Sequence, residues 1–197
     1  MSPATGRADR RRNRERLIEA AAEVFRRDGP AAPLEEIARR AGVGSATLHR
    51  HFGSRRDLLE AVCADGIDQL CVRAGELAAG DGDAAADLWG WLDELVRFAS
   101  ATRGVVGVLL AEPPGPELPV CHSNRLRDVL GPLRARAAGS GAVHPEATVD
   151  DLLALVTGIS RVTEDAPEAA SRLLRLARAG VGSDRISHER VARVGGA

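Results

Sequence analysis

The sequence has 197 residues, 44% of them hydrophobic, which is enough apolar material for a substantial buried core. No run of about 18 apolar residues could span a membrane, and no apolar segment follows the arginine-rich N-terminus as a secretory signal requires, so we expect a soluble cytoplasmic protein. The net charge is −1, but arginine exceeds acid in residues 1–60 and acid exceeds arginine beyond them, which predicts a polyanionic partner for the N-terminal part.

An arginine-rich stretch, residues 1–13, has no apolar periodicity. Such a stretch is expected to be disordered in the free protein. Two interpretations stay open: a solvated tail, or a flexible arm that reaches phosphates or an adjacent minor groove, where narrow A·T-rich segments attract arginine. The arginines that would make these contacts are Arg10, Arg11 and Arg12.

Three short helices are expected next. Residues 14–28 form an amphipathic pattern that ends at Gly29. Residues 34–41 and 45–52 then predict two helices that meet at a tight turn, where Gly42 supplies the positive φ that such a turn needs.

The last of these helices presents a short polar face. Leu48 and Phe52 lie one turn apart and are expected to face inward. The residues left on the outer side are Ser45, Ala46, His49 and Arg50. A short helix held at a fixed angle, with small, polar and cationic side chains outward, fits the major groove of DNA. We interpret the pair of helices as a helix-turn-helix.

The flanks of this unit complete a longer pattern: Leu17, Ala21, Phe25, Gly29, Ile37-Ala38, Ala41-Gly42-Val43, Thr47-Leu48, Phe52, Ser54-Arg55 and Leu58-Leu59. This pattern resembles the N-terminal part of the TetR family of bacterial transcriptional regulators. The resemblance implies an all-α protein with a DNA-binding head over residues 14–54 and an effector-binding and dimerisation body over residues 55–182. Residues 183–197 have a weak pattern and are expected to form a tail.

The resemblance also implies particular contacts with DNA. These are Ser45, Ala46 and Arg50 toward bases, His49 and His51 near phosphates, Thr47 at either, and Arg55 at a phosphate. Two alternatives stay open, a phosphate contact for Arg50 and a capping or packing role for His51. The sequence departs from the family at His49, where tyrosine is usual, and at Pro33, where a serine or threonine often begins the second helix.

Beyond residue 54 the sequence keeps a helical period and shows no strand-like alternation. The expected helices are 55–79, 84–102, 105–112, 123–138, 148–162 and 165–180. The proline-rich segment 112–119 cannot be helical.

The body carries no recognisable catalytic motif. A nucleophile elbow, a phosphate-binding glycine loop, a paired-histidine zinc motif and a dinucleotide fingerprint are all absent, and the three cysteines lack CxxC spacing. We therefore predict no enzyme activity, no cofactor and no metal site.

A small-molecule effector cavity between the helices of the body is the functional alternative. Its candidate lining is Trp89, Trp91, Phe98 and Leu109, with polar contacts from Glu112, His122 and Asn124. The competing interpretation is that these aromatic residues are ordinary core. Trp89 and Trp91 are two residues apart, so they point to different sides of one helix.

The resemblance implies a homodimer in which the last two helices pack against their copies. The expected interface is Val149, Leu152, Leu153, Val156, Ile159, Leu173, Leu174 and Ala177. The alternative is that the apolar faces of both helices pack against the chain's own core. We expect a regulator, most simply a repressor released from a palindromic operator by an effector. The alternatives are a regulator without an inducer, and a ligand-binding or enzymatic protein that keeps the head only for packing.

Overall fold

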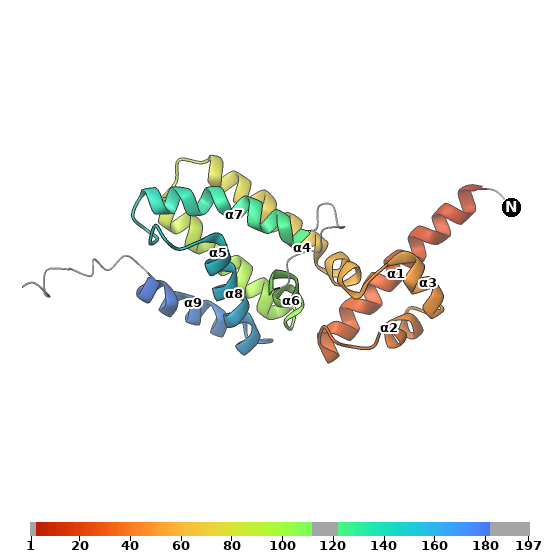
Figure 1. Ribbon diagram of the computed structural model, residues 1–197. Helices are drawn as coiled ribbons and strands as arrows, with labels where there is room; N and C mark the ends of the chain where they lie inside the picture. Colours follow the sequence, from red (N-terminus) through yellow and green to blue (C-terminus); the bar gives the residue numbers. More distant parts are fainter. Residues whose placement is uncertain (1–2, 112–121, 182–197) are drawn as a thin grey trace, which may run out of the picture.

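The computed structural model describes residues 3–111 and 122–181, and all regular structure within them is α-helical (Figure 1). The helices are α1 (Pro3–Asp28), α2 (Leu34–Arg40), α3 (Ser45–His51), α4 (Arg55–Ala79), α5 (Ala84–Ala101), α6 (Val105–Ala111), α7 (His122–Gly139), α8 (Val149–Val162) and α9 (Pro167–Val181). In Figure 1, α1–α3 form a head at one end, α5–α9 form a body at the other, and α4 runs between them. The all-α prediction is confirmed within the described residues; the proline-rich segment and the tail lie outside them.

The head is built on a small core shared by α1, α2 and α3. Its buried residues include Leu17, Ala21, Phe25, Ile37, Leu48 and Phe52. Gly42 forms the turn between α2 and α3 with a φ of 67°, and a Cβ at this position would lie 2.7 Å from Nη2 of Arg16. Glycine is therefore favoured on conformational grounds, whereas the flexible end of the Arg16 side chain can move away from an added Cβ. The Val43 N–H donates to the Ala38 carbonyl at 3.0 Å and closes the end of α2, which fixes the start of α3.

The prediction of disorder is wrong for residues 3–13, because helix α1 is continuous from Pro3 (Figure 1). Proline suits the first turn of a helix, where an N–H would have no partner. Charged pairs one turn apart then support the extension: Arg11 lies 3.5 Å from Glu15, and Arg12 lies 2.6 Å from Asp9. The arginine-rich residues therefore lie on the projecting first part of helix α1.

Helix α4 connects the two parts. It begins with a capping box in which the Ser54 Oγ accepts a hydrogen bond from the Asp57 N–H at 3.1 Å and the Ser54 N–H donates to Asp57 Oδ2 at 3.0 Å. Its 25 residues extend about 37 Å at the helical rise per residue. The helix packs on α1 in the head and on α5 and α7 in the body, so a change in its direction moves the head.

Helix α5 is the centre of the body. Its buried residues are Leu88, Trp89, Trp91, Leu92, Leu95, Val96, Ala99 and Ser100, and α7, α8 and α9 pack around it. Helix α8 begins with a capping box formed by Thr148 and Asp151. Within the described residues, no helix is both long and apolar enough to cross a membrane.

Candidate nucleic-acid interface

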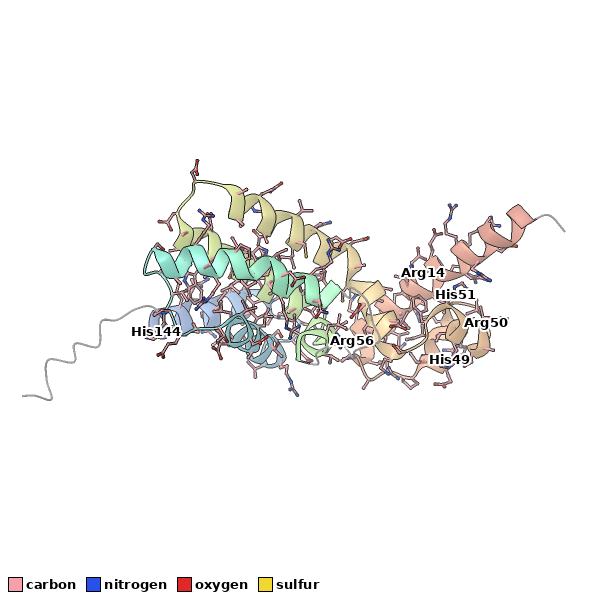
Figure 2. The ribbon with its side chains drawn as sticks, turned by 45° about the horizontal axis from the view of Figure 1, so that its top comes forward. Arg14, His49, Arg50, His51, Arg56 and His144 are labelled. Atoms are coloured by element: carbon pink, nitrogen blue, oxygen red, sulfur yellow. The ribbon has the colours of Figure 1, made fainter. Side chains whose placement is uncertain are left out.

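Helix α3 presents the polar face that the sequence predicts. Leu48 is buried against the head, while the side chains of Ser45, Ala46, His49 and Arg50 are exposed. His49 and Arg50 lie at the end of the molecule formed by the head, away from the body (Figure 2). The interface is therefore open to a partner within the described part of the chain.

Arg50 is oriented by its neighbour one turn earlier. Its Nη2 donates a hydrogen bond to Thr47 Oγ1 at 2.9 Å. Thr47 is half-buried, so its hydroxyl is a fixed acceptor on the surface of α3. Arg50 is exposed, and the planar fork of its guanidinium suits either a guanine edge or a phosphate.

A cleft of about 470 Å³ separates the end of α3 from the projecting part of α1. It is lined by Asp9, Arg10, Asn13, Thr47, Arg50 and His51. Three of these side chains are cationic or can become so, and Arg14 lies beside them with its guanidinium 5.2 Å from the Phe52 ring centroid (Figure 2). This concentration of positive charge around one opening suits a phosphate group.

The same arginine side chains affect the pKa of His51. Burial, followed by the positive charges of Arg10, Arg14 and Arg50, holds the pKa of His51 below its ordinary value of 6.5. A bound phosphate would act in the opposite direction, since a nearby negative charge favours the imidazolium.

The lowered pKa of His51 makes the stability of the free protein depend on pH. Because the unfolded chain binds this proton more readily than the folded chain, the contribution is complete above pH 6.5 and is lost as pH falls through and below that value. We expect His51→Asn to reduce the drop in melting temperature between pH 7.5 and 5.5, a window below which the carboxylates titrate (about pH 4). His49→Asn, on the exposed face of the same helix, is the control and should follow the wild-type curve. An identical pH dependence in both variants would contradict this assignment.

The three arginines of the predicted arm have different surroundings. Arg10 lines the cleft, whereas Arg11 and Arg12 pair with acidic residues of α1 itself. Sequence reasoning missed Asp9 and Asn13 as cleft residues because it treated this stretch as unstructured. If residues 3–13 are read as helix, the positions of Arg10, Asn13 and Arg14 already indicate a shared face.

Arg55 contacts the protein's own main chain. Its side chain is half-buried, and Nη1 donates to the carbonyl of Pro30 at 3.0 Å and to the carbonyl of Ala32. These bonds use Nη1 to hold the loop between α1 and α2, and a phosphate contact by the rest of the guanidinium stays a prediction. Pro33 precedes α2 without any side-chain cap, consistent with the missing hydroxyl noted in the sequence.

Of the predicted effector residues, Trp89 lines an open cleft of about 370 Å³ between α5 and α9, together with Leu174, Arg175 and Arg178. Trp91 is fully buried and its Nε1 donates to the Leu70 carbonyl at 2.9 Å, and Leu109 is also fully buried. Trp89 points to another side of α5, as predicted, and lies under the Arg178 guanidinium at 5.7 Å. Phe98 is half-buried with its ring against Gly66 of α4.

The polar members of the predicted effector site are only partly described. Asn124 is half-buried on α7. His122 begins α7, but its side chain lies outside the described residues, as does all of Glu112. No group of three or more metal-binding side chains occurs among the residues that the structure describes.

The predicted dimer stripe requires a correction. Leu152, Leu153, Val156, Ile159 and Leu174 are buried within the chain's own core, and Val149, Leu173 and Ala177 are half-buried. A residue covered by its own chain is not available to a partner, so most of this stripe serves the fold. The large apolar side chains that α8 and α9 leave exposed are Val162, 75% exposed, and Leu176, 64% exposed.

Comparison with known proteins agrees with this arrangement. Residues 17–62 match the family described as bacterial regulatory proteins, tetR family, and residues 83–183 match the C-terminal domain described as transcriptional regulator SbtR-like. The HTH-type transcriptional repressor LfrR of Mycolicibacterium smegmatis is 35% identical over 86 residues, which cover 43% of this chain and 45% of LfrR. The chain spans less than half the length of the curated relatives that it matches.

Solved structures extend the similarity to most of the chain. A TetR transcriptional regulator from Streptomyces coelicolor is 29% identical with a TM-score of 0.51, covering 86% of this chain and 98% of that one. A TetR-family regulatory protein from Rhodococcus RHA1 has a TM-score of 0.59 at 22% identity, covering 86% of this chain and 97% of that one, and shows the shared fold.

An exposed short helix on a three-helix head, joined by one long helix to an all-helical second domain, defines a class of helix-turn-helix proteins. Both parts of the sequence match the same family. The chain belongs to the TetR family of bacterial regulatory proteins.

Proposed function

We propose that the protein is a homodimeric transcriptional regulator, a repressor that binds a palindromic DNA operator and is released by a small-molecule effector. The observation that carries the proposal is the exposed face of α3 beside the cationic cleft formed with α1. In this arrangement α3 enters the major groove and Arg50 contacts a base edge, while Arg10 and His51 bind the adjacent phosphates.

The dimer is proposed to form through α8 and α9. The apolar side chains of Val162 and Leu176 remain exposed on these helices, and Leu155 and Leu173 beside them are only half-buried. Packing of this face on a second copy buries them in a four-helix bundle. Two heads related by a two-fold axis then bind half-sites about one helical turn apart, or a multiple of it.

The proposed effector is supported by membership of the family, in which effector binding is typical. One observation, at two of the predicted effector residues, favours the alternative of a regulator without an inducer. Trp91 and Leu109 are fully buried, and Trp91 donates a hydrogen bond to the Leu70 carbonyl, so these two side chains pack as core residues of the body. A ligand-release screen against the bound operator separates the two forms of the proposal.

Selection of duplexes from a random pool by the full-length protein tests DNA binding. We expect a palindromic site bound with strong salt dependence. Arg50→Ala should reduce the discrimination between this site and scrambled DNA by about 5- to 150-fold, equivalent to about 1–3 kcal/mol for a lost bidentate base contact.

Arg73→Ala is the matched control for Arg50→Ala, because Arg73 is an exposed arginine on α4 in the body. It should leave the discrimination unchanged. Equal loss of affinity on every sequence after Arg50→Ala would assign Arg50 to phosphate only. Failure of the wild-type protein to enrich any sequence would overturn the proposed function.

A further inference from the structure

Arg103 connects the head to the body at a point separate from α4. Its Nη1 donates to the main-chain oxygen of Arg26 at 2.8 Å and to that of Arg27 at 3.4 Å, and its Nε lies 2.9 Å from Asp165 Oδ2. The final carbonyls of a helix lack intrahelical donors and form the negative end of its dipole, so a guanidinium is well suited to bind them. One side chain therefore contacts both the end of α1 in the head and the α8–α9 turn in the body.

The backbone that carries Arg103 is firmly held. Arg103 and Asp165 have positive φ values of 47° and 59°, which are uncommon for residues other than glycine and persist where the surroundings fix them. The Asp165 N–H donates to the Ser100 carbonyl at 3.2 Å, and the buried Ser100 hydroxyl donates to the Thr163 carbonyl. The α5–α6 turn and the α8–α9 turn are thus bonded to each other, and Arg103 projects from this unit.

The head and body are loosely packed beside this connection. A cleft of about 280 Å³ lies there, lined by Pro30 of the head and by residues of the body that include Gly104, Thr157 and Arg161. Side-chain packing therefore does not fix the head at this side of the molecule. Because α4 packs on both parts, the head moves with the direction of this helix, and a second attachment at the end of α1 restricts that movement.

We propose that Arg103 is a positioning residue for operator binding, which sets the angle between head and body by tying the end of α1 to the α8–α9 turn. The proposal rests on the proposed function, because α8 and α9 are there the helices that contact the second subunit. The contacts of Arg103 with Asp165 and with the end of α1 then fix the orientation of each head relative to the two-fold axis of the dimer. The tie fixes the separation of the two α3 helices and hence the half-site spacing that the dimer accepts.

The test uses the full-length protein and the operator that the wild-type protein selects from a random pool. Duplexes are made with one base pair removed, one added or two added between the half-sites, together with a duplex that carries a single half-site. Arg103→Gly removes the side chain and tolerates the positive φ, and Arg103→Lys keeps a cation that can bind the same carbonyls. Fluorescence anisotropy gives the affinity of each protein for each duplex, and thermal melting reports folding.

For the wild-type protein we expect affinity to fall about 100-fold when the spacing changes by one base pair, since this rotates one half-site relative to the other. For Arg103→Gly we expect a fall of less than about tenfold, with unchanged affinity for the single half-site, and for Arg103→Lys a partial return to the wild-type profile. Asp165→Asn, which keeps the carbonyl bonds of Arg103 but removes its ionic anchor, should lie between.

Each other outcome has a defined meaning. A spacing profile of Arg103→Gly that matches the wild type would overturn the proposed positioning role while leaving the proposed function intact. A loss of single half-site affinity with a lowered melting temperature, not restored by lysine, would show a purely structural role and overturn it as well. Absence of any selected operator for the wild-type protein would instead refute the proposed function itself.

Discussion

Replacing Trp91 by alanine is expected to lower the free energy of unfolding by about 3–5 kcal/mol, the usual cost of removing a large aromatic side chain from a packed core. Trp91 is fully buried at the centre of α5, and its Nε1 donates to the Leu70 carbonyl of α4 at 2.9 Å. The alanine leaves a cavity where α4 and α5 meet and removes a buried donor. Equilibrium unfolding in urea measures the loss, with an unchanged slope showing that both states keep their compactness.

The neighbouring tryptophan supplies a matched control. Trp89 is 4% exposed, but its Nε1 has no hydrogen-bond partner in the described part of the chain. Trp91→Phe should therefore destabilise the protein more than Trp89→Phe, because only the first removes a hydrogen bond and the second relieves an unsatisfied donor. Equal costs for the two phenylalanine variants would show that the Trp91 hydrogen bond contributes little, and that volume alone decides.

Introducing a charge at Leu176 is expected to separate the proposed dimer. This side chain of α9 is 64% exposed in the single chain, and a carboxylate buried without a partner at an apolar interface is strongly unfavourable. Leu176→Glu should yield a folded monomer in analytical ultracentrifugation. Its affinity for a two-half-site operator should fall about 100-fold or more, because the second head no longer binds as part of the same molecule.

Val72→Glu provides the comparison for Leu176→Glu. Val72 is 62% exposed on α4, so it presents a similar apolar area away from α8 and α9. It should remain dimeric and keep the affinity of the wild-type protein. A dimeric Leu176→Glu variant with full operator affinity would show that the two subunits meet through another face.

The local pattern of the sequence was sufficient for the head. The expected helices 34–41 and 45–52 correspond to α2 (Leu34–Arg40) and α3 (Ser45–His51), because short apolar periods and a glycine at a positive-φ turn define such elements almost alone. The outward face of α3 followed from the same periodicity. The helical form of residues 3–13 was missed because low hydrophobicity was taken as disorder, whereas charge pairs along α1 stabilise the helix without a core.

The role of each individual arginine could not be predicted from the sequence. All 27 cationic residues apart from histidine are arginine, so composition does not distinguish a DNA contact from a structural one. Arg55 and Arg103 donate to main-chain carbonyls that are 23 or more residues away in the chain, and only the folded structure brings these groups together. The apolar residues of α8 could serve either the core or a dimer interface, and the structure shows that most of them pack inward.

The projecting first helix has a practical consequence for experiments on this protein. Residues of α1 near its start line the same cleft as the end of α3, so anything fused ahead of α1 is held close to the bound duplex. A polyhistidine tag there would add its own charge to the contact with phosphates, and a bulky carrier would obstruct it. Affinities should therefore be compared before and after proteolytic removal of such a fusion.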